Sequence, residues 1–293
     1  MGLGWLLSKL PYRVQMASGR RLGDLARLLV AERRRVAQIN IDLCFPELSA
    51  QRRHTILREH FRSVGMGAME TAICWWGHDA TIRQLASIEG LEHLQAAAER
   101  GQGIILLSAH FTSLELGVRI GQHYLRQFDI ETTAMYKPPH DPVIDHVMRT
   151  RREAHIGGKS IPYKNVKGFI RALRRGDAVW YAGDQRAAKK QGELVEFFGR
   201  PALTHTAISR LAHMTDATIV PFFTLRRDDG QGYRLIVQAP LTDFPSGDDI
   251  ADAHRINALI EAVVRRAPEQ YFWLHQRFRT PAADPYAADA SSS

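Results

Sequence analysis

Residues 103–117 read Gly103-Ile-Ile-Leu-Leu-Ser-Ala-His110-Phe-Thr-Ser-Leu-Glu115-Leu-Gly117. A glycine-containing turn precedes the apolar run Ile104 to Leu107, which is long enough for a buried strand and too short for a helix. A helix is expected to start at Leu114. His110 is therefore expected just beyond the end of a strand, at the edge of an α/β sheet where ligands collect and helix N-termini point.

Two interpretations fit His110 and Glu115. In the first, the Glu115 carboxylate bonds one imidazole nitrogen of His110 and leaves the other free to take a proton from a substrate hydroxyl. In the second, Thr112 and Glu115 form a capping box that satisfies N–H groups at the start of the helix. The local pattern alone supports both equally.

Further blocks accompany this stretch along nearly the whole chain. In chain order they are Asn40-Ile-Asp-Leu-Cys-Phe-Pro-Glu47, Ser63-Val-Gly-Met-Gly-Ala-Met-Glu70, Ala178-Val-Trp-Tyr-Ala-Gly-Asp-Gln185, Phe197-Phe-Gly-Arg-Pro201, Ile219-Val-Pro221 and Pro268-Glu-Gln-Tyr-Phe-Trp-Leu-His-Gln-Arg277. Together with His110-Phe-Thr-Ser-Leu-Glu115, they resemble the lipid A biosynthesis acyltransferases. These are the lauroyl and myristoyl transferases of the glycerolipid acyltransferase superfamily, which carries a His-x4-acid motif.

The resemblance implies transfer of a fatty acyl chain from an acyl carrier protein thioester to a hydroxyacyl chain of a lipid A precursor. It places this reaction at the cytoplasmic face of the bacterial inner membrane. His110 would be the general base and Glu115 its orienting acid, with backbone N–H groups at the start of the next helix stabilising the oxyanion. Neither a metal nor a redox cofactor is implied.

Asp184 is a further candidate for the active-site region. Ala178 to Ala182 reads as a buried strand, which would deliver Asp184 to the sheet edge of His110 if the two strands run parallel. In the family the matching aspartate belongs to the active site. The alternative is that Asp184 caps a turn.

Two other functions use the same core. An acyltransferase for a lysophospholipid or another membrane amphiphile would employ the same His110 and Glu115. A non-catalytic lipid-binding relative would keep the core and leave the pair unused.

The composition favours one α/β domain with a mixed, largely parallel central sheet flanked by helices. The chain has 293 residues, of which 45% are hydrophobic, enough for a sizeable core. We expect a membrane-associating segment at 1–40, the acyltransferase domain at 41–279 and a disordered, dispensable tail at 280–293. Cys44 and Cys74 have no metal-ligand spacing and are expected to be buried thiols.

The N-terminal segment holds most of the net charge. Residues 1–40 contain eight Lys or Arg and two acidic residues, a net of +6 out of +8 for the chain. Apolar positions recur at helical spacing over residues 21–39, so a basic amphipathic helix on an anionic membrane surface is one interpretation. An ordinary surface helix packed on the domain is the other. No DNA- or RNA-binding pattern accompanies these charges, so no nucleic-acid partner is expected.

Candidate anion-binding residues are Arg149, Arg152 and His155. A helix over residues 145–152 would gather arginines that could clamp a substrate phosphate, although a solvated helix face is the commoner role of such a run. His155 stands where the family often carries an arginine. A second basic helix, residues 166–175, could either receive the acidic acyl carrier protein or be an ordinary solvated face.

Overall fold

The structure is a computed structural model that describes residues 2–189 and 192–287. Its α-helices are α1 (Gly2–Ser8), α2 (Tyr12–Leu29), α3 (Ala31–Cys44), α4 (Ala50–Trp76), α5 (Asp79–Leu85), α6 (Leu91–Glu99), α7 (Leu114–Leu125), α8 (Pro142–Ile156), α9 (Val166–Arg174), α10 (Ala207–Thr215) and α11 (Asp249–Arg266), with 3-10 turns at Arg126–Phe128 and Pro268–Gln270. Its strands are β1 (Ala86–Glu89), β2 (Ile104–Ser108), β3 (Thr132–Tyr136), β4 (Gly157–Pro162), β5 (Ala178–Ala182), β6 (Gly192–Phe197), β7 (Arg200–His205), β8 (Thr218–Arg226) and β9 (Tyr233–Val237).

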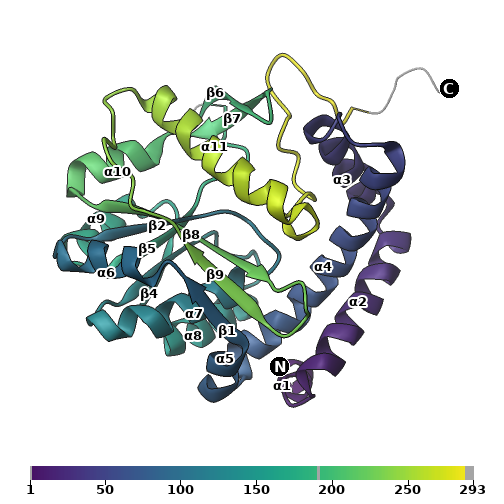
Figure 1. Ribbon diagram of the computed structural model, residues 1–293, viewed down its shortest axis with the longest axis horizontal. Helices are drawn as coiled ribbons and strands as arrows, with labels where there is room; N and C mark the ends of the chain where they lie inside the picture. The colour runs from purple at the N-terminus through teal and green to yellow at the C-terminus, as the bar shows by residue number, and fades with distance from the viewer. Residues whose placement is uncertain (1, 190–191, 288–293) are drawn as a thin grey trace.

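A seven-stranded sheet in the order β1-β9-β8-β2-β5-β3-β4 forms the centre, and β6 and β7 make a separate hairpin. Neighbouring strands of the central sheet are parallel except β8 and β9. Side chains alternate between its faces: Ile104 and Leu106 pack with α6, α7 and α8, whereas Ile105 and Leu107 pack with α9, α10 and α11. The predicted α/β domain with a largely parallel sheet is confirmed (Figure 1).

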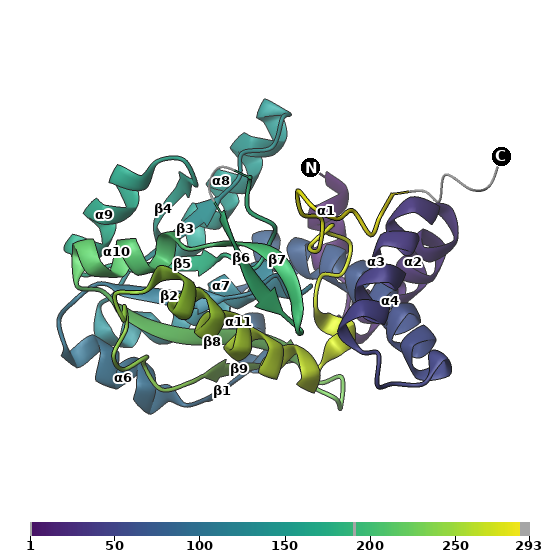
Figure 2. The ribbon, with the colours of Figure 1, turned by 90° about the horizontal axis from the view of Figure 1, so that it is seen from above.

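Helices α2, α3 and α4 form a layer beside the sheet domain (Figure 2). The contact of α2 with α4 depends on glycines, because a Cβ on Gly65 would lie 2.1 Å from the carbonyl oxygen of Gly19 and 2.5 Å from the nitrogen of Gly23. The glycines of α2 and α4 thus permit close packing of the two helices. This packing holds α2 firmly on the domain, while Leu22, Leu25, Leu28 and Leu29 on the same helix remain exposed.

The prediction of one helix over residues 21–39 is wrong. The chain bends at Val30, whose φ of −104° and ψ of 68° end α2 and start α3. Neither glycine nor proline marks this position, so the sequence gives no turn signal. The bend lets both helices pack against α4, a tertiary requirement that local periodicity does not contain.

The prediction of a disordered tail from residue 280 is wrong for residues 280–287. Tyr286 is only 6% exposed, and its hydroxyl donates to Asn40 Oδ1 at 2.5 Å and accepts from the Phe278 N–H at 3.0 Å. One buried aromatic side chain thus outweighs the polar composition around it. Residues 288–293 of the predicted tail lie outside the described residues.

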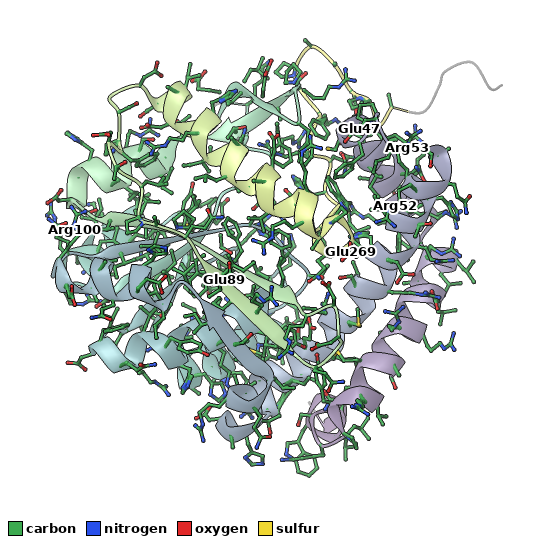
Figure 3. All side chains as sticks on the ribbon, in the orientation of Figure 1. Glu47, Arg52, Arg53, Glu89, Arg100 and Glu269 are labelled. Carbon is green, nitrogen blue, oxygen red and sulfur yellow. The ribbon has the colours of Figure 1, made fainter. Side chains whose placement is uncertain are left out.

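The turn between α3 and α4 joins the helical layer to α11. Figure 3 shows Glu47 in this turn and Arg53 near the start of α4; Glu47 pairs with Arg265 at 3.1 Å and Arg53 with Asp42 at 2.6 Å. Exposed pairs of this kind contribute little to stability, and the buried Cys44 beneath the turn is part of the core that fixes it. Within the described part of the chain, no helix is both long and apolar enough to cross a membrane.

Candidate active site

His110 and Asp184 are brought together by the register of two parallel strands. Ser108 at the end of β2 pairs with Ala182 at the end of β5, and each candidate residue lies two positions beyond its strand. Equal offsets on paired parallel strands place the two side chains side by side at the carboxyl edge of the sheet. The parallel arrangement expected for Asp184 is confirmed.

Asp184 holds His110 through two hydrogen bonds. His110 Nδ1 lies 2.6 Å from Oδ1 of Asp184, and the backbone N–H of His110 donates to Oδ2 at 3.0 Å. A carboxylate can only accept, so the ring proton is on Nδ1 and Nε2 has the lone pair of the neutral imidazole. Across residues 2–189 and 192–287, no hydrogen bond reaches Nε2.

The electrostatics of the pair favour its charged form. Burial raises the pKa of Asp184, but the His110 charge and hydrogen bonds from His110 and Tyr271 lower it to about 2. Burial lowers the pKa of His110, yet the Asp184 charge and hydrogen bond outweigh burial and raise it. The arrangement therefore stabilises an imidazolium ion once His110 has taken a proton.

Tyr271 completes the contacts of Asp184 and was not predicted from the sequence. Its hydroxyl donates to Asp184 Oδ2 at 2.8 Å. Backbone pairing brings it there, because the Phe272 N–H donates to the His110 carbonyl and the Thr112 N–H to the Gln270 carbonyl, both at 2.8 Å. The only sequence signal was its place in the block Pro268 to Arg277.

Asn40 fixes the rest of this C-terminal segment. Its amide donates to the carbonyls of Trp273 at 2.7 Å and His275 at 2.8 Å. Burial lowers the pKa of His275 to about 4, and its neutral Nε2 accepts from the backbone N–H of Arg186 at 3.0 Å. These bonds enclose a recess of about 10 Å³ beside His110, roughly the space of one water.

The predicted hydrogen bond between Glu115 and His110 is absent from the structure. Glu115 instead accepts from Arg152 Nε at 3.0 Å and Nη2 at 2.6 Å, and from the indole N–H of Trp75 at 2.8 Å. Burial raises the pKa of Glu115, but the Arg152 charge and these hydrogen bonds lower it. Its carboxylate joins α7 to α8 and α4, and Asp184 makes the contact with the His110 ring that was expected of Glu115.

The capping-box interpretation is also wrong. The N-cap of α7 is Ser113, which makes no side-chain capping bond, and its hydroxyl donates to the Thr224 carbonyl at 2.8 Å. Thr112 Oγ1 instead accepts from Arg226 Nη1 at 2.9 Å and bonds Ser63 Oγ at 2.7 Å. The side chains of Thr112 and Glu115 thus bond residues on other elements, and neither caps the N-terminus of α7.

Behind this loop lies a buried ion pair. Arg226 contacts Glu70 through Nε at 2.5 Å and Nη2 at 2.6 Å, and Tyr233 donates to Glu70 at 2.7 Å. Because Arg226 also bonds Thr112 and Ser63, it ties the loop after His110 to α4. No local sequence pattern indicates this pair, whose members are 156 positions apart.

The three candidate anion-binding residues do not converge. Arg152 is committed to Glu115, with its side chain only 11% exposed. Burial and the nearby Arg119 charge lower the pKa of His155, whose Nδ1 lies 4.0 Å from Asp79. Arg149 is exposed on α8. Of the three, Arg149 alone is exposed and takes part in no ion pair within the described residues, so it is the one most accessible to a ligand.

Some of the expected oxyanion donors are already in use. The N–H of Phe111 donates to the Ala109 carbonyl at 2.8 Å, that of Thr112 to Gln270 at 2.8 Å and that of Leu114 to Phe111 at 3.0 Å. These three groups cannot also hold an oxyanion in this arrangement. We therefore expect the oxyanion donors among the remaining N–H groups of the first turn of α7.

Comparison with known proteins identifies the family of this chain. Residues 1–280 match the family described as bacterial lipid A biosynthesis acyltransferase. The chain is 36% identical over 283 residues to a lipid A biosynthesis lauroyltransferase of Escherichia coli K12, covering 96% of this chain and 90% of that protein. It is 34% identical over 281 residues to the palmitoleoyltransferase of that organism, with coverage of 96% and 90%, and 30% identical over 263 residues to its myristoyltransferase, with coverage of 89% and 79%. The chain therefore belongs to the bacterial lipid A biosynthesis acyltransferase family and is an acyltransferase of that family.

Proposed function

We propose that this acyltransferase moves a fatty acyl chain from an acyl carrier protein thioester to a hydroxyl on an acyl chain of a lipid A precursor, with His110 as general base. The observation that carries the proposal is the pairing of His110 Nδ1 with buried Asp184 at 2.6 Å. That pairing fixes the tautomer in which Nε2 can accept a proton. The Asp184 charge also stabilises the imidazolium that forms when His110 takes the proton.

The proposed reaction needs no covalent acyl-enzyme. His110 Nε2 takes the proton of the acceptor hydroxyl while the oxygen attacks the thioester carbonyl, so a C–O bond forms and a tetrahedral oxyanion develops. Collapse of this intermediate breaks the C–S bond. The thiolate of the carrier then takes the proton from His110, which returns the imidazole to its neutral form.

Substrate contacts are proposed at the same edge of the sheet. Arg149 is retained as a phosphate contact, whereas Arg152 would act indirectly through its ion pair with Glu115. Lys167 at the start of α9 is the part of the predicted carrier-docking face nearest the site, because α9 runs from the carboxyl end of β4 back to the amino end of β5. Arg171 and Arg174 therefore lie toward the opposite edge.

Association of the N-terminal segment with an anionic membrane, at the cytoplasmic face of the inner membrane, is part of the proposal. Among the described residues, the first 30 contain nine of the sixteen exposed large hydrophobic side chains, and residues 1–40 have a net charge of +6. Exposed apolar surface combined with basic charge is typical of helices that lie on anionic bilayers. The packing of α2 on α4 is compatible with this, since the opposite face of α2 remains exposed.

The test is acyl transfer by purified protein with acyl carrier protein thioesters and a panel of lipid A precursors and lysophospholipids. We expect transfer to the lipid A precursor, and a loss of roughly 100-fold or more in His110→Ala, the scale of a lost general base. Circular dichroism checks that the variant is folded. Near-normal turnover in a folded His110→Ala would refute the mechanism, and transfer only to lysophospholipids would refute the acceptor.

A further inference from the structure

A basic recess lies at the corner between α2 and α3, apart from the residues that contact His110. It has a volume of about 840 Å³ and is bounded by α2, α3, α4 and the C-terminal segment, which lie together in Figure 1. Its lining residues are Arg27, Ala31, Arg34, Arg35, Gln38, Ile39, His54, Leu57, Pro285 and Ala287. Three arginines and a histidine face the recess, and this lining contains no Asp or Glu.

The three arginines differ from others in the same helical layer. Arg20, Arg53 and Arg62 pair with carboxylates at 3.1, 2.6 and 2.7 Å. In contrast, Arg34 donates to the Arg27 carbonyl at 2.8 Å, and Arg35 donates to the carbonyls of Tyr286 and Ala287, both at 2.7 Å. Carbonyl partners orient a guanidinium group without neutralising it, so the recess retains its positive charge.

Arg27 is a second feature that suits the recess to an anion. Its Nε is buried and has no hydrogen-bond partner in the described part of the chain, and Arg27 forms no salt bridge there. The nearest acid on its helix, Asp24, already accepts from Arg62 Nε at 2.7 Å. A phosphate offers several acceptor oxygens to converging guanidinium groups and would balance their charge.

The surroundings indicate where such a phosphate would come from. Leu28 and Leu29, which follow Arg27 in the chain, are 63% and 73% exposed, and Val30 at the corner is also exposed. Inorganic phosphate would make no favourable contact with this apolar rim. A membrane lipid would place its phosphate in the recess and its acyl chains against the leucines.

We propose that the recess lined by Arg27, Arg34 and Arg35 binds the phosphate of an anionic glycerophospholipid of the bilayer. This inference deepens the membrane association proposed above, because it assigns a defined headgroup site to a segment otherwise described only by its charge. A short chain of hydrogen bonds also connects this site to the recess beside His110. Arg35 holds the Tyr286 carbonyl, and the Tyr286 hydroxyl bonds Asn40, which lines the recess beside His110.

The test compares two double variants of the full chain with the same loss of charge. Arg27→Gln/Arg34→Gln removes guanidinium groups from the recess, and the matched control Arg20→Gln/Arg21→Gln removes two from the exposed side of α2. Binding to phosphatidylcholine vesicles containing phosphatidylglycerol is measured by co-sedimentation. We expect the recess variant to bind about tenfold more weakly than the control. The difference should remain measurable in high salt, because screening weakens the diffuse surface attraction more than direct contacts with a bound phosphate. Equal binding by the two variants would overturn the proposal.

Thermal shifts test the site without vesicles. Short-chain phosphatidylglycerol should raise the Tm of the wild type and the control but not of the recess variant. Inorganic phosphate should give a smaller rise, since it lacks the chains that meet Leu28 and Leu29. Equal rises with phosphate and lipid would overturn the lipid assignment. If the wild type ignored vesicles but showed the lipid shift, the membrane proposal would fail and the headgroup site would stand.

A single variant guards against misfolding of the double one. Arg27→Gln breaks no side-chain hydrogen bond of the described residues and is therefore expected to fold. We expect its vesicle affinity to fall at least about threefold, which is somewhat less than one basic residue near an anionic surface usually contributes. An unchanged affinity and an unchanged lipid shift in Arg27→Gln would refute the role of Arg27.

Discussion

Replacing Asp184 with asparagine removes one negative charge and almost no volume. Asp184 accepts at Oδ2 from the backbone N–H of His110 and from the Tyr271 hydroxyl, and at Oδ1 from His110 Nδ1. The backbone N–H cannot become an acceptor, so the amide oxygen of the asparagine must take the Oδ2 position. Its NH2 group then faces Nδ1, which moves the ring proton to Nε2 and blocks the base.

The size of the effect follows from two contributions. The contacts of Asp184 lower its pKa from 3.8 to about 2, which corresponds to about 2 kcal/mol of stabilisation of its charge and to roughly 30-fold in rate if it is lost at the imidazolium stage. The wrong tautomer should cost about as much again. We therefore expect transfer to fall about 1000-fold in Asp184→Asn.

The assay is transfer to the lipid acceptor across a range of pH, with unfolding followed separately. The wild-type rate should rise with pH through a value above 6.5, because His110 must be neutral and its pKa is raised. In Asp184→Asn the charge that raises the pKa of His110 is gone, and only burial, which lowers this pKa, remains. The residual activity should therefore titrate at lower pH. Tyr271→Phe is the control: it removes one donor and keeps the tautomer, so a loss below about tenfold is expected. Activity within tenfold of wild type in a folded Asp184→Asn would refute this reasoning.

Three further predictions concern stability and its pH dependence. Glu115→Gln should lose about 3–5 kcal/mol of unfolding free energy, because it leaves Arg152 with a buried charge, and its pH profile of activity should stay wild-type; a shifted profile would mean that Glu115 serves His110 after all. Glu70→Gln should destabilise by a similar amount by stranding Arg226, measured by denaturant unfolding, whereas near-native stability would contradict the buried pair. The lowered pKa of Asp184 should add about 2 kcal/mol that is present above pH 3.8 and disappears as pH falls to about 2, so wild type and Asp184→Asn should converge in stability in acid; a constant difference would contradict it.

The elements of the sheet could be predicted because their signals are local. The run Ile104 to Leu107 is apolar on both faces, as a strand buried on both sides must be, and the structure has β2 over Ile104–Ser108. The helix start at Leu114 and the strand Ala178 to Ala182 are likewise confirmed. His110 and Asp184 could be expected at one edge, because parallel strands end on the same side of a sheet.

The pairing of acids with bases could not be predicted from the sequence. Spacing along a helix made Glu115 a reasonable partner for His110, yet the register of β2 against β5 puts Asp184 on the imidazole, and α8 supplies Arg152 to Glu115. Each of these contacts depends on which strands are neighbours. Local periodicity carries no information about that choice.

The sequence by itself determined the α/β class, the strand that ends at His110, the family blocks and the concentration of basic charge before residue 40. Tertiary structure decided that the chain bends at Val30, that Tyr286 is buried and that Tyr271 reaches Asp184. The physical reason is the distance along the chain over which each kind of signal acts. Apolar periodicity and turn residues act over a few positions, whereas a hydrogen bond between residues 87 positions apart exists only once the whole sheet and its C-terminal segment are packed.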